Sequence, residues 1–138
     1  MSKTAREIMT ADAECVAENE SLIDAAQKMA RLDVGALPIC GEDDRLKGML
    51  TDRDIVTRVL AEGKDPQQVK AGELADGKPI TIGADDPAEE ALRTMKEHKV
   101  RRLPVIDGHT LVGVISQADL ARELGSEQVG ELLETISA

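Results

Sequence analysis

The amino-acid sequence predicts an α/β fold of the mixed (α+β) kind, built from two copies of one unit in which strand, helix, strand, strand and helix follow one another. Two observations predict this class. Much of the chain occurs twice, and within each copy short apolar runs bounded by turn residues alternate with stretches of helical periodicity. We therefore expect a first repeat over 4–63, a second over 69–125 and a helical tail over 126–138.

The duplication has a nearly constant register. Adding 66 to a residue number maps 4–41 onto 70–107, and adding 65 maps 46–56 onto 111–121, so one residue is lost in a turn. The matching pairs include Ala5/Ala71, Glu7/Glu73, Ala25/Ala91, Met29/Met95, Leu37/Leu103, Pro38/Pro104, Leu46/Leu111, Gly48/Gly113, Thr51/Ser116 and Asp54/Asp119.

The predicted elements follow in the same order in both repeats. An entry helix and a brief strand precede an amphipathic helix, a hairpin of two apolar strands and a closing helix. In the first repeat these are 5–9, a strand around Val16, a helix after Ser21, strands Ala36–Cys40 and Leu46–Thr51, and a helix over 52–60. In the second they are 69–74, a strand around Ile82, a helix after Asp86, strands 102–106 and 111–116, and a helix over Gln117–Leu124.

Caps and apolar stripes predict the two amphipathic helices. Ser21 is expected to be the N-cap of the first, because a short polar side chain there accepts a hydrogen bond from a free helix N–H. In the second, we expect Asp86 to cap and Pro87 to take the first helical position, where its missing N–H has no cost. The stripes that should face the core are Leu22, Ala25, Ala26, Met29 and Leu32 in one helix and Ala88, Ala91, Leu92 and Met95 in the other.

Proline and glycine punctuate the rest of each repeat. Pro38 and Pro104 predict a strand start or an edge strand, since proline cannot donate to a sheet. Asp107-Gly108 predicts a tight hairpin, and 41–44 a longer turn that accounts for the change of offset. The expected boundary between the repeats is 63–66, which is too short for a flexible tether, so the two halves should pack on each other.

Composition narrows the classes of function. Apolar residues make up 41% of the chain and charged residues 32%, a globular balance, but Phe, Tyr and Trp are absent. The core must then be aliphatic, and no aromatic side chain is available to stack on a base. The net charge of −10 disfavours nucleic acid as a partner. No apolar run has the length of a membrane span, and the N-terminus lacks the apolar core of a signal peptide, so we expect a cytoplasmic protein with no membrane partner.

Neither catalysis nor a metal site is predicted. The chain has no Gly-x-Ser-x-Gly, P-loop or dinucleotide-binding glycine pattern. His98 and His109 lack metal-ligand spacing, and the acidic run 42–44 lacks the further ligands of a calcium loop.

Cys15 and Cys40 lie at strand ends that could be neighbours, where a disulfide would add about 3 kcal/mol to the free energy of unfolding. A cytoplasmic redox poise favours free thiols instead, and both alternatives stay open.

A repeated Thr/Ser-x-x-Asp motif is the candidate site. Thr51 and Asp54 in the first repeat correspond to Ser116 and Asp119 in the second. One interpretation is helix capping, because a hydroxyl at the N-cap and a carboxylate in the first turn both stabilise a helix N-terminus. The other is that these groups, beside free helix N–H donors, bind the ribose and phosphate of a nucleotide. The motif by itself is compatible with both.

The order of motifs adds a family resemblance that covers nearly the whole chain. Ser-Leu-x-x-Ala-x-x-x-Met, Leu-Pro-Ile and Leu-x-Gly-x-Leu-Thr-Asp-Arg-Asp-Ile follow one another, and this pattern resembles the CBS domain. The duplication makes the chain resemble a CBS pair, or Bateman module, and 36–41 with 45–56 is similar to small stand-alone actinobacterial CBS proteins of hypoxic or dormancy responses. The resemblance implies pseudo-two-fold packing with two clefts between the repeats, where members bind AMP, ADP, ATP or S-adenosylmethionine.

The resemblance also implies roles for the repeated motif. Asp54 and Asp119 would bind ribose hydroxyls, with Thr51 and Ser116 near ribose or phosphate. Adenine would be held by backbone groups and aliphatic side chains, which suits a chain without aromatic residues.

Phosphate binding is expected to be uneven. Arg101 and Arg102 precede Leu103-Pro104, where related modules place phosphate-binding residues, and arginine can hold a phosphate through two parallel hydrogen bonds. Their first-repeat counterparts are Gly35 and Ala36, while Arg53 stands inside the first Thr-x-x-Asp motif. If the repeats face one another, Arg53 joins Arg101 and Arg102, giving one competent phosphate site and one weak or vacant site. The alternative is that these arginines only pair with the many acidic residues.

Two hypotheses of function follow. The first is a non-enzymatic regulatory module that requires no cofactor, binds an adenosine nucleotide between its repeats and reports energy or stress state to a protein partner in trans or through a homodimer. The second is a ligand-free, stress-associated dimeric scaffold, stapled by the disulfide if that forms.

Overall fold

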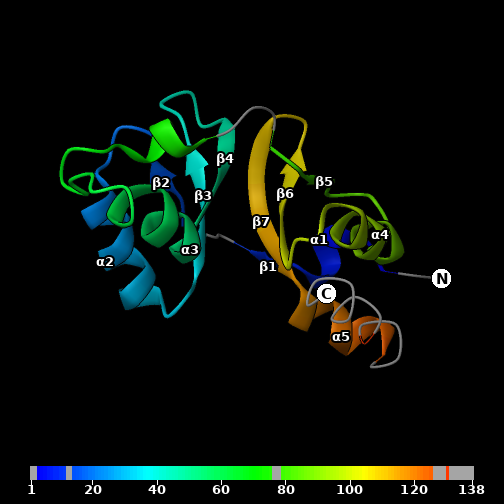
Figure 1. The fold of residues 1–138 in the computed structure, drawn as a ribbon. Helices are drawn as coiled ribbons and strands as arrows, with labels where there is room; N and C mark the ends of the chain where they lie inside the picture. Colours follow the sequence, from blue (N-terminus) through cyan, green and yellow to red (C-terminus); the bar gives the residue numbers. More distant parts are fainter. Residues whose placement is uncertain (1–2, 12–13, 76–78, 126–129, 131–138) are drawn as a thin grey trace. The chain divides into compact units, whose positions relative to one another are not determined.

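A computed structural model describes residues 3–11, 14–75, 79–125 and 130 of the chain. The chain divides into two compact units: a middle unit of residues 14–79, and a terminal unit that combines 1–13 with 80–138. Each unit has one sheet and several helices, so the mixed α+β class with two repeats is confirmed (Figure 1). Pseudo-two-fold packing of the repeats stays a prediction, and the expected tail over 126–138 lies outside the described residues except for Gly130.

The middle unit has a three-stranded sheet in the order β2-β3-β4. β2 pairs parallel with β3, and β3 pairs antiparallel with β4. The helix predicted over 52–60 begins as an α-helix and ends as a π-helical segment, with Ala61 N–H donating to the Val56 carbonyl at 2.8 Å. The elements are β2 (Val16–Ala17), α2 (Leu22–Leu32), β3 (Ala36–Cys40), β4 (Leu46–Thr51), α3 (Asp52–Ile55), η1 (Val56–Leu60) and the 3-10 helix η2 (Ala71–Leu74).

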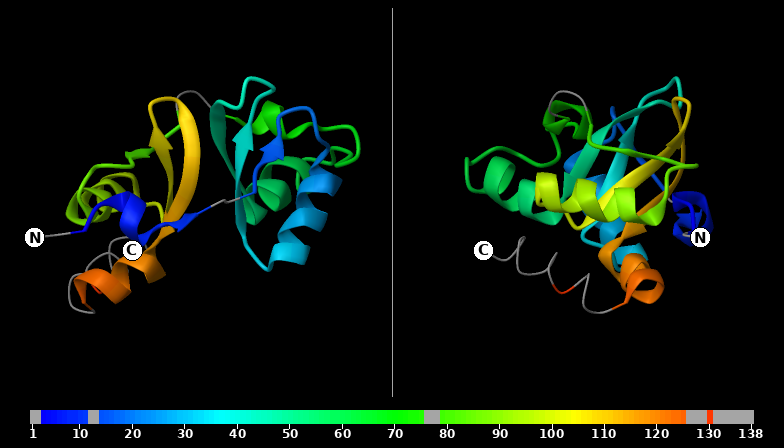
Figure 2. Two further views of the ribbon diagram at one scale, coloured as in Figure 1. Left: turned by 180° about the vertical axis from the view of Figure 1, so that it is seen from behind. Right: turned by 90° about the vertical axis from the view of Figure 1, so that its right-hand side faces the viewer.

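The terminal unit has a four-stranded sheet in the order β1-β7-β6-β5. β6 and β7 form the predicted tight hairpin, with a two-residue loop in which Gly108 has φ of +65°. Seen from behind, the helices of residues 5–8, 88–98 and 117–124 lie together on one side of this sheet (Figure 2, left). The elements are α1 (Ala5–Ile8), β1 (Thr10–Ala11), β5 (Ile82–Gly83), α4 (Ala88–His98), β6 (Arg102–Asp107), β7 (Thr110–Ser116) and α5 (Gln117–Leu124).

The two repeats exchange their entry segments. α1 belongs to the first repeat in sequence, yet the Ala5 N–H donates to the Asp86 carbonyl at 2.8 Å in the second repeat. η2 makes the reciprocal contact, with the Ala71 N–H donating to the Glu20 carbonyl at 2.9 Å. Both bonds obey the offset of 66, so they are the same interaction made twice. The packing units therefore cut across the sequence repeats 4–63 and 69–125, and the segment 63–66 lies inside the middle unit.

Polar contacts also hold α1 to the second repeat. Arg6 pairs with Asp107 at 2.9 Å, and this hydrogen bond raises the pKa of Arg6. Lys3 pairs with Glu123 of α5 at 3.2 Å. At the start of α1, the Thr4 backbone N–H donates to the Glu7 carboxylate at 3.0 Å and lowers the pKa of Glu7. These exposed contacts orient α1, while burial of its apolar side supplies most of its stability.

Gly48 and Gly113 occupy equivalent positions in the two repeats. At both positions the exchanged segment approaches so closely that a side chain would meet it. A Cβ at Gly113 would lie 2.6 Å from the Thr10 carbonyl oxygen of β1. A Cβ at Gly48 would lie 3.2 Å from the Cβ of Ala75, the residue that follows η2. The β1–β7 pairing was not predicted, since a two-residue strand carries no periodicity of its own.

Each unit has an aliphatic core that includes the exchanged segment. Met29 and Met95 are buried as expected, whereas Ala26 was wrongly assigned to the core stripe and is exposed. The terminal core comprises Ala5, Ile8, Ile82, Ala84, Ala88, Ala91, Leu92, Met95, Leu103, Val105, Ile115 and Leu120. The middle core comprises Val16, Leu22, Ala25, Met29, Leu37, Ile39, Leu50, Ile55, Val59, Ala71 and Leu74.

Capping signals were confirmed in the first repeat and only partly in the second. Ser21 is the N-cap of α2, and its hydroxyl accepts from the Asp24 N–H at 3.1 Å. In α4, however, Pro87 is the N-cap, and Asp86 does not cap. The Asp86 carboxylate instead accepts from the Gly83 N–H at 2.9 Å and closes the turn before the helix.

The proline strands are not edge strands. β3 is central in its sheet, and β6 is also flanked on both sides. The expectation of a strand start or an edge strand at the prolines was wrong because it neglected how short the outer strands are. β2 reaches only Ile39 and Cys40, so Pro38 has a partner on the β4 side alone. Pro104 likewise lies one residue before the pairing of β6 with β5 begins at Val105. A missing N–H is tolerated where the strand locally has a free side.

Cys15 and Cys40 form a disulfide in the structure. Their Cα atoms are 5.8 Å apart, because β2 begins one residue after Cys15 and pairs with the end of β3. The bond is local to the middle unit and ties the first strand of the sheet to the central strand.

The exchange predicts that the packing units, not the sequence repeats, are the cooperative units. A fragment of residues 14–79 should unfold cooperatively in urea, because it contains a complete core. A fragment of 4–63 should show no cooperative transition, because it lacks Ala71 and Leu74 and leaves Ala5 and Ile8 without partners. Circular dichroism against urea tests this, and equal cooperativity of the two fragments would contradict the exchange.

Reduction of the disulfide should lower the free energy of unfolding by about 3 kcal/mol, the chain-entropy value for a loop of this size. The sequence separation of the two cysteines is 25 residues. Urea denaturation with and without reductant gives the number, and the Cys15→Ser/Cys40→Ser variant is the control that reductant should not affect. Two titratable thiols in unreduced protein, with no effect of reductant, would show that the bond does not form.

Candidate functional site

The first Thr-x-x-Asp motif lies at the junction of β4 and α3. Thr51 is the last residue of β4 and the N-cap of α3, and its hydroxyl accepts from the Asp54 N–H at 3.1 Å. In return, Oδ2 of Asp54 accepts from the Thr51 N–H at 3.1 Å. This reciprocal pair is a capping box, so the capping interpretation is confirmed here. The other carboxylate oxygen, Oδ1 of Asp54, accepts no hydrogen bond from the described residues.

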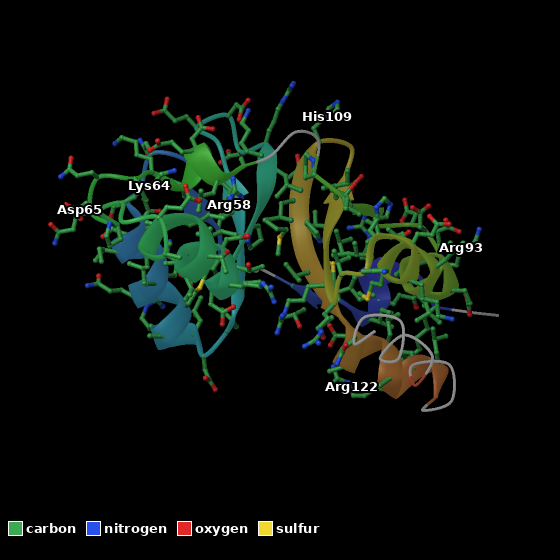
Figure 3. All side chains as sticks on the ribbon, in the orientation of Figure 1. Arg58, Lys64, Asp65, Arg93, His109 and Arg122 are labelled. Atoms are coloured by element: carbon green, nitrogen blue, oxygen red, sulfur yellow. A yellow bond between two sulfur atoms is a disulfide. The ribbon has the colours of Figure 1, made fainter. Side chains whose placement is uncertain are left out.

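The second motif repeats this geometry between β7 and α5. The Ser116 hydroxyl accepts from the Asp119 N–H at 3.2 Å, and Asp119 Oδ2 accepts from the Ser116 N–H at 2.9 Å. The Ser116 hydroxyl also lies 3.0 Å from Asp119 Oδ2. Asp119 is the one charged residue that is buried in the described part of the chain. Its Oδ1 accepts from Nη2 of Arg122, one turn later on α5 (Figure 3).

Arg101 and Arg102, the expected phosphate-binding residues, lie beside the second motif. Arg102 opens β6 opposite Ser116, and the Arg101 carbonyl accepts from the Gln117 N–H at 3.0 Å. Both arginines are exposed, as is Arg53 on α3 in the middle unit. None of these three forms an ion pair with another residue that the structure describes, so the alternative of pairing with acidic residues gains no support from the described part.

The first motif has an acidic neighbour in place of these arginines. Asp52, the first residue of α3, donates its N–H to the Gly35 carbonyl at 2.9 Å. A Cβ at Gly35 would lie 3.1 Å from the Asp52 carboxylate, so a larger residue there would require this exposed side chain to shift. The two repeats therefore share a backbone frame but differ in charge around it.

Sequence reasoning missed two residues next to the second motif. Oε1 of Gln117 is buried and accepts no hydrogen bond within the described part of the chain, which leaves an acceptor for a donor from elsewhere. Arg122 was missed because the motif was taken to end at Asp119. The offset of 65 places Thr57 opposite Arg122, and extending the repeat comparison by three residues would have revealed the difference.

The structure brings no metal-binding group together. Across residues 3–11, 14–75, 79–125 and 130, no three His, Cys, Asp or Glu side chains are placed to hold a metal ion. His98 ends α4, and His109 lies at the tip of the β6–β7 hairpin (Figure 3). The helices described here are too short or too polar to cross a membrane.

The capping boxes predict a stability cost for losing either hydroxyl. Thr51→Ala and Ser116→Ala should each lower the free energy of unfolding by about 1 kcal/mol, the usual value of an N-cap. Urea denaturation measures this, with Thr57→Ala as the matched control. The Thr57 hydroxyl only donates to the Arg53 carbonyl of its own helix at 2.9 Å, so its loss should have little effect. Equal losses in all three variants would refute the capping role.

Comparison with known proteins gives a consistent result. Residues 5–61 and 71–126 each match the family model of the CBS domain. Over 133 residues the chain is 51% identical to hypoxic response protein 1 of Mycobacterium tuberculosis, covering 96% of this chain and 93% of that protein. It is 38% identical over 137 residues to the CBS domain-containing protein YhcV of Bacillus subtilis, covering 96% of this chain and 94% of YhcV.

Solved structures agree with the sequence matches. A crystal structure of hypoxic response protein I with two coordinated zinc ions matches with a TM-score of 0.83 and 55% identity, covering 87% of this chain and 98% of that chain. A hexameric CBS-CP12 protein from bloom-forming cyanobacteria matches with a TM-score of 0.77 and 28% identity, covering 89% of this chain and 72% of that one.

Proposed function

The chain belongs to the CBS-domain family, and from this premise we propose that it is a non-enzymatic regulatory module that binds an adenosine nucleotide between its two repeats. The ligand class is AMP, ADP, ATP or S-adenosylmethionine. Proteins with CBS domains are generally regulatory, which supports the non-enzymatic part of the proposal.

The observation that carries the proposal is the unused carboxylate oxygen of Asp54. Capping consumes Oδ2 of Asp54 and the Thr51 hydroxyl, and it leaves Oδ1 as an acceptor at the end of β4. A vicinal diol such as that of ribose supplies two hydroxyl donors, and hydrogen bonds to an ionised carboxylate are strong. Capping and ligand binding are thus compatible: the cap fixes the carboxylate, and its second oxygen serves the ligand.

Three arginines that pair with no described acidic residue support the phosphate part of the proposal. Arg53, Arg101 and Arg102 are exposed and form no ion pair with another described residue. In a chain with 27 acidic and 17 basic residues, arginines that pair with no acidic residue of the described part are unexpected. A nucleotide phosphate would supply the missing counter-charge.

Signalling would proceed through a partner in trans or a homodimer. A ligand that binds one conformation better than another shifts the population toward it, and a partner then binds the favoured state. The similarity to hypoxic response protein 1 supports a role in a stress response, and the hexameric CBS-CP12 relative supports self-association.

Zinc is not part of the proposal. The solved hypoxic response protein I has two coordinated zinc ions. Among the residues that the present structure describes, no three potential ligands come together, and both cysteines are in the disulfide.

The second candidate is a ligand-free dimeric scaffold of the stress response. It is favoured by the disulfide between Cys15 and Cys40, which rigidifies one unit without a ligand, and by capping boxes that are complete without one.

Adenine nucleotides should stabilise the protein against heat. A ligand at 100 times its Kd adds roughly 2.7 kcal/mol to the free energy of unfolding, which raises the melting temperature by several degrees. Differential scanning calorimetry with AMP, ADP, ATP and S-adenosylmethionine measures the shift. The absence of Trp and Tyr also lets an ultraviolet spectrum of the purified protein reveal co-purified adenine directly.

The Asp54→Asn/Asp119→Asn variant is the control, because it removes both carboxylate charges and keeps the side-chain size. A shift in the wild type that this variant abolishes supports nucleotide binding. No shift with any of the four ligands, together with a spectrum free of adenine, would reject the proposal in favour of the scaffold.

A further inference from the structure

We propose that Arg122 makes the two repeats unequal: it occupies the Asp119 carboxylate, so that Asp54 is the residue that receives the ribose of the ligand. The inference rests on the proposed function, and it deepens that function by naming the residue that chooses between the two motifs.

The hydrogen bonds of Asp119 leave little capacity for a diol. Its Oδ2 accepts from the Ser116 N–H at 2.9 Å and lies 3.0 Å from the Ser116 hydroxyl, while its Oδ1 accepts from Arg122. A carboxylate offers about four lone-pair positions. With three positions used, at most one is left, and a vicinal diol brings two donors.

Asp54 has the capacity that Asp119 lacks. Its Oδ2 accepts from the Thr51 N–H at 3.1 Å, and its Oδ1 accepts nothing from the described part of the chain. By the same count of about four positions, three are left on Asp54, enough for both hydroxyls of a ribose. Asp54 is also only half-buried, whereas Asp119 is buried.

Displacing Arg122 would also leave the Asp119 carboxylate without a positive counter-charge. The Asp119 side chain is 6% exposed, while that of Arg122 is 71% exposed and lies over it from the next turn of α5. A neutral diol can replace the hydrogen bond of the guanidinium but not its positive charge. An almost buried carboxylate left without a counter-charge is strongly disfavoured, so ribose competes poorly with Arg122.

The cation that pairs with Asp119 has no counterpart in the first repeat. The offset of 65 aligns Arg122 with Thr57, three residues after each motif carboxylate. The Thr57 hydroxyl donates to the Arg53 carbonyl at 2.9 Å and is engaged within its own helix. The first repeat therefore has no side-chain cation at the position from which Arg122 reaches Asp119.

Isothermal titration with AMP, ADP, ATP and S-adenosylmethionine tests this, since all four share the ribose diol. The wild type should bind at one site, and Asp54→Asn should weaken that binding about tenfold or more, as expected for removing a hydrogen bond to a charged group. Asp119→Asn should change it less than about twofold, within the error of independent sites. In the Asp54→Asn background, Arg122→Ala should restore binding at Asp119.

A reciprocal variant keeps the test independent of any loss of stability in Arg122→Ala. Thr57→Arg places a guanidinium on exposed helix surface, and it should weaken wild-type binding about tenfold by occupying Asp54. Arg93→Ala is the matched control, because Arg93 pairs with Glu90 at the same i,i+3 spacing on α4, at 2.8 Å and outside both motifs (Figure 3). It should leave binding unchanged.

The possible results distinguish the role of Arg122 from nucleotide binding itself. Binding that Asp119→Asn abolishes and Asp54→Asn spares, or that Thr57→Arg leaves unchanged, overturns the role of Arg122 while nucleotide binding stands. No binding of any of the four ligands to the wild type or to Arg122→Ala overturns the proposed function, and this inference with it.

Discussion

The fold depends on the hydrogen bonds by which each entry segment closes the core of the other repeat. The Ala5 N–H reaches Asp86 and the Ala71 N–H reaches Glu20, at 2.8 and 2.9 Å. Each entry segment also places two apolar side chains in a core otherwise built by the opposite repeat. Neither sequence repeat alone can satisfy these backbone donors or fill its core, so the duplication is a structural requirement of the fold.

The exchanged segments also lie against the two strands that lead into the Thr/Ser-x-x-Asp motifs. Gly48 and Gly113 allow the exchanged segments to lie against β4 and β7, and those two strands end at Thr51 and Ser116. There a capping box fixes the carboxylate three residues later. The chemistry of each motif then depends on what surrounds this rigid carboxylate. Oδ1 of Asp54 accepts no hydrogen bond from the described residues, while Asp119 pairs with Arg122. In our proposal this contrast makes the two motifs unequal.

Local signals in the sequence predicted most of the elements. The offsets of 66 and 65 aligned the repeats, and Ser21, Thr51 and Ser116 all proved to be N-caps. What could not be predicted was non-local. The exchange of entry segments depends on contacts between residues far apart in the chain, such as Ala5 with Asp86 and Ala71 with Glu20, and no periodicity encodes them.

The candidate site was likewise predictable only where local sequence signals define it. The Thr/Ser-x-x-Asp frame follows from the repeated motif, and the arginines near it were expected from the family resemblance. The pairing of Arg122 with Asp119 follows only from helix geometry and side-chain direction, because residues three apart on α5 are neighbours. The burial of Asp119 makes its pairing with Arg122 energetically important, and this burial can be known only from the folded structure.

A titration of isotope-labelled protein with AMP, followed through its backbone amide resonances, tests the account most directly. The N–H groups of Thr51 and Asp54 bond to the groups that are proposed to receive the ribose, and those of Ser116 and Asp119 form the equivalent pair. We expect the Thr51 and Asp54 resonances to shift and saturate first while the Ser116 and Asp119 resonances move less. Equal shifts of both pairs, shifts of the second pair alone, or no shifts at all would contradict it.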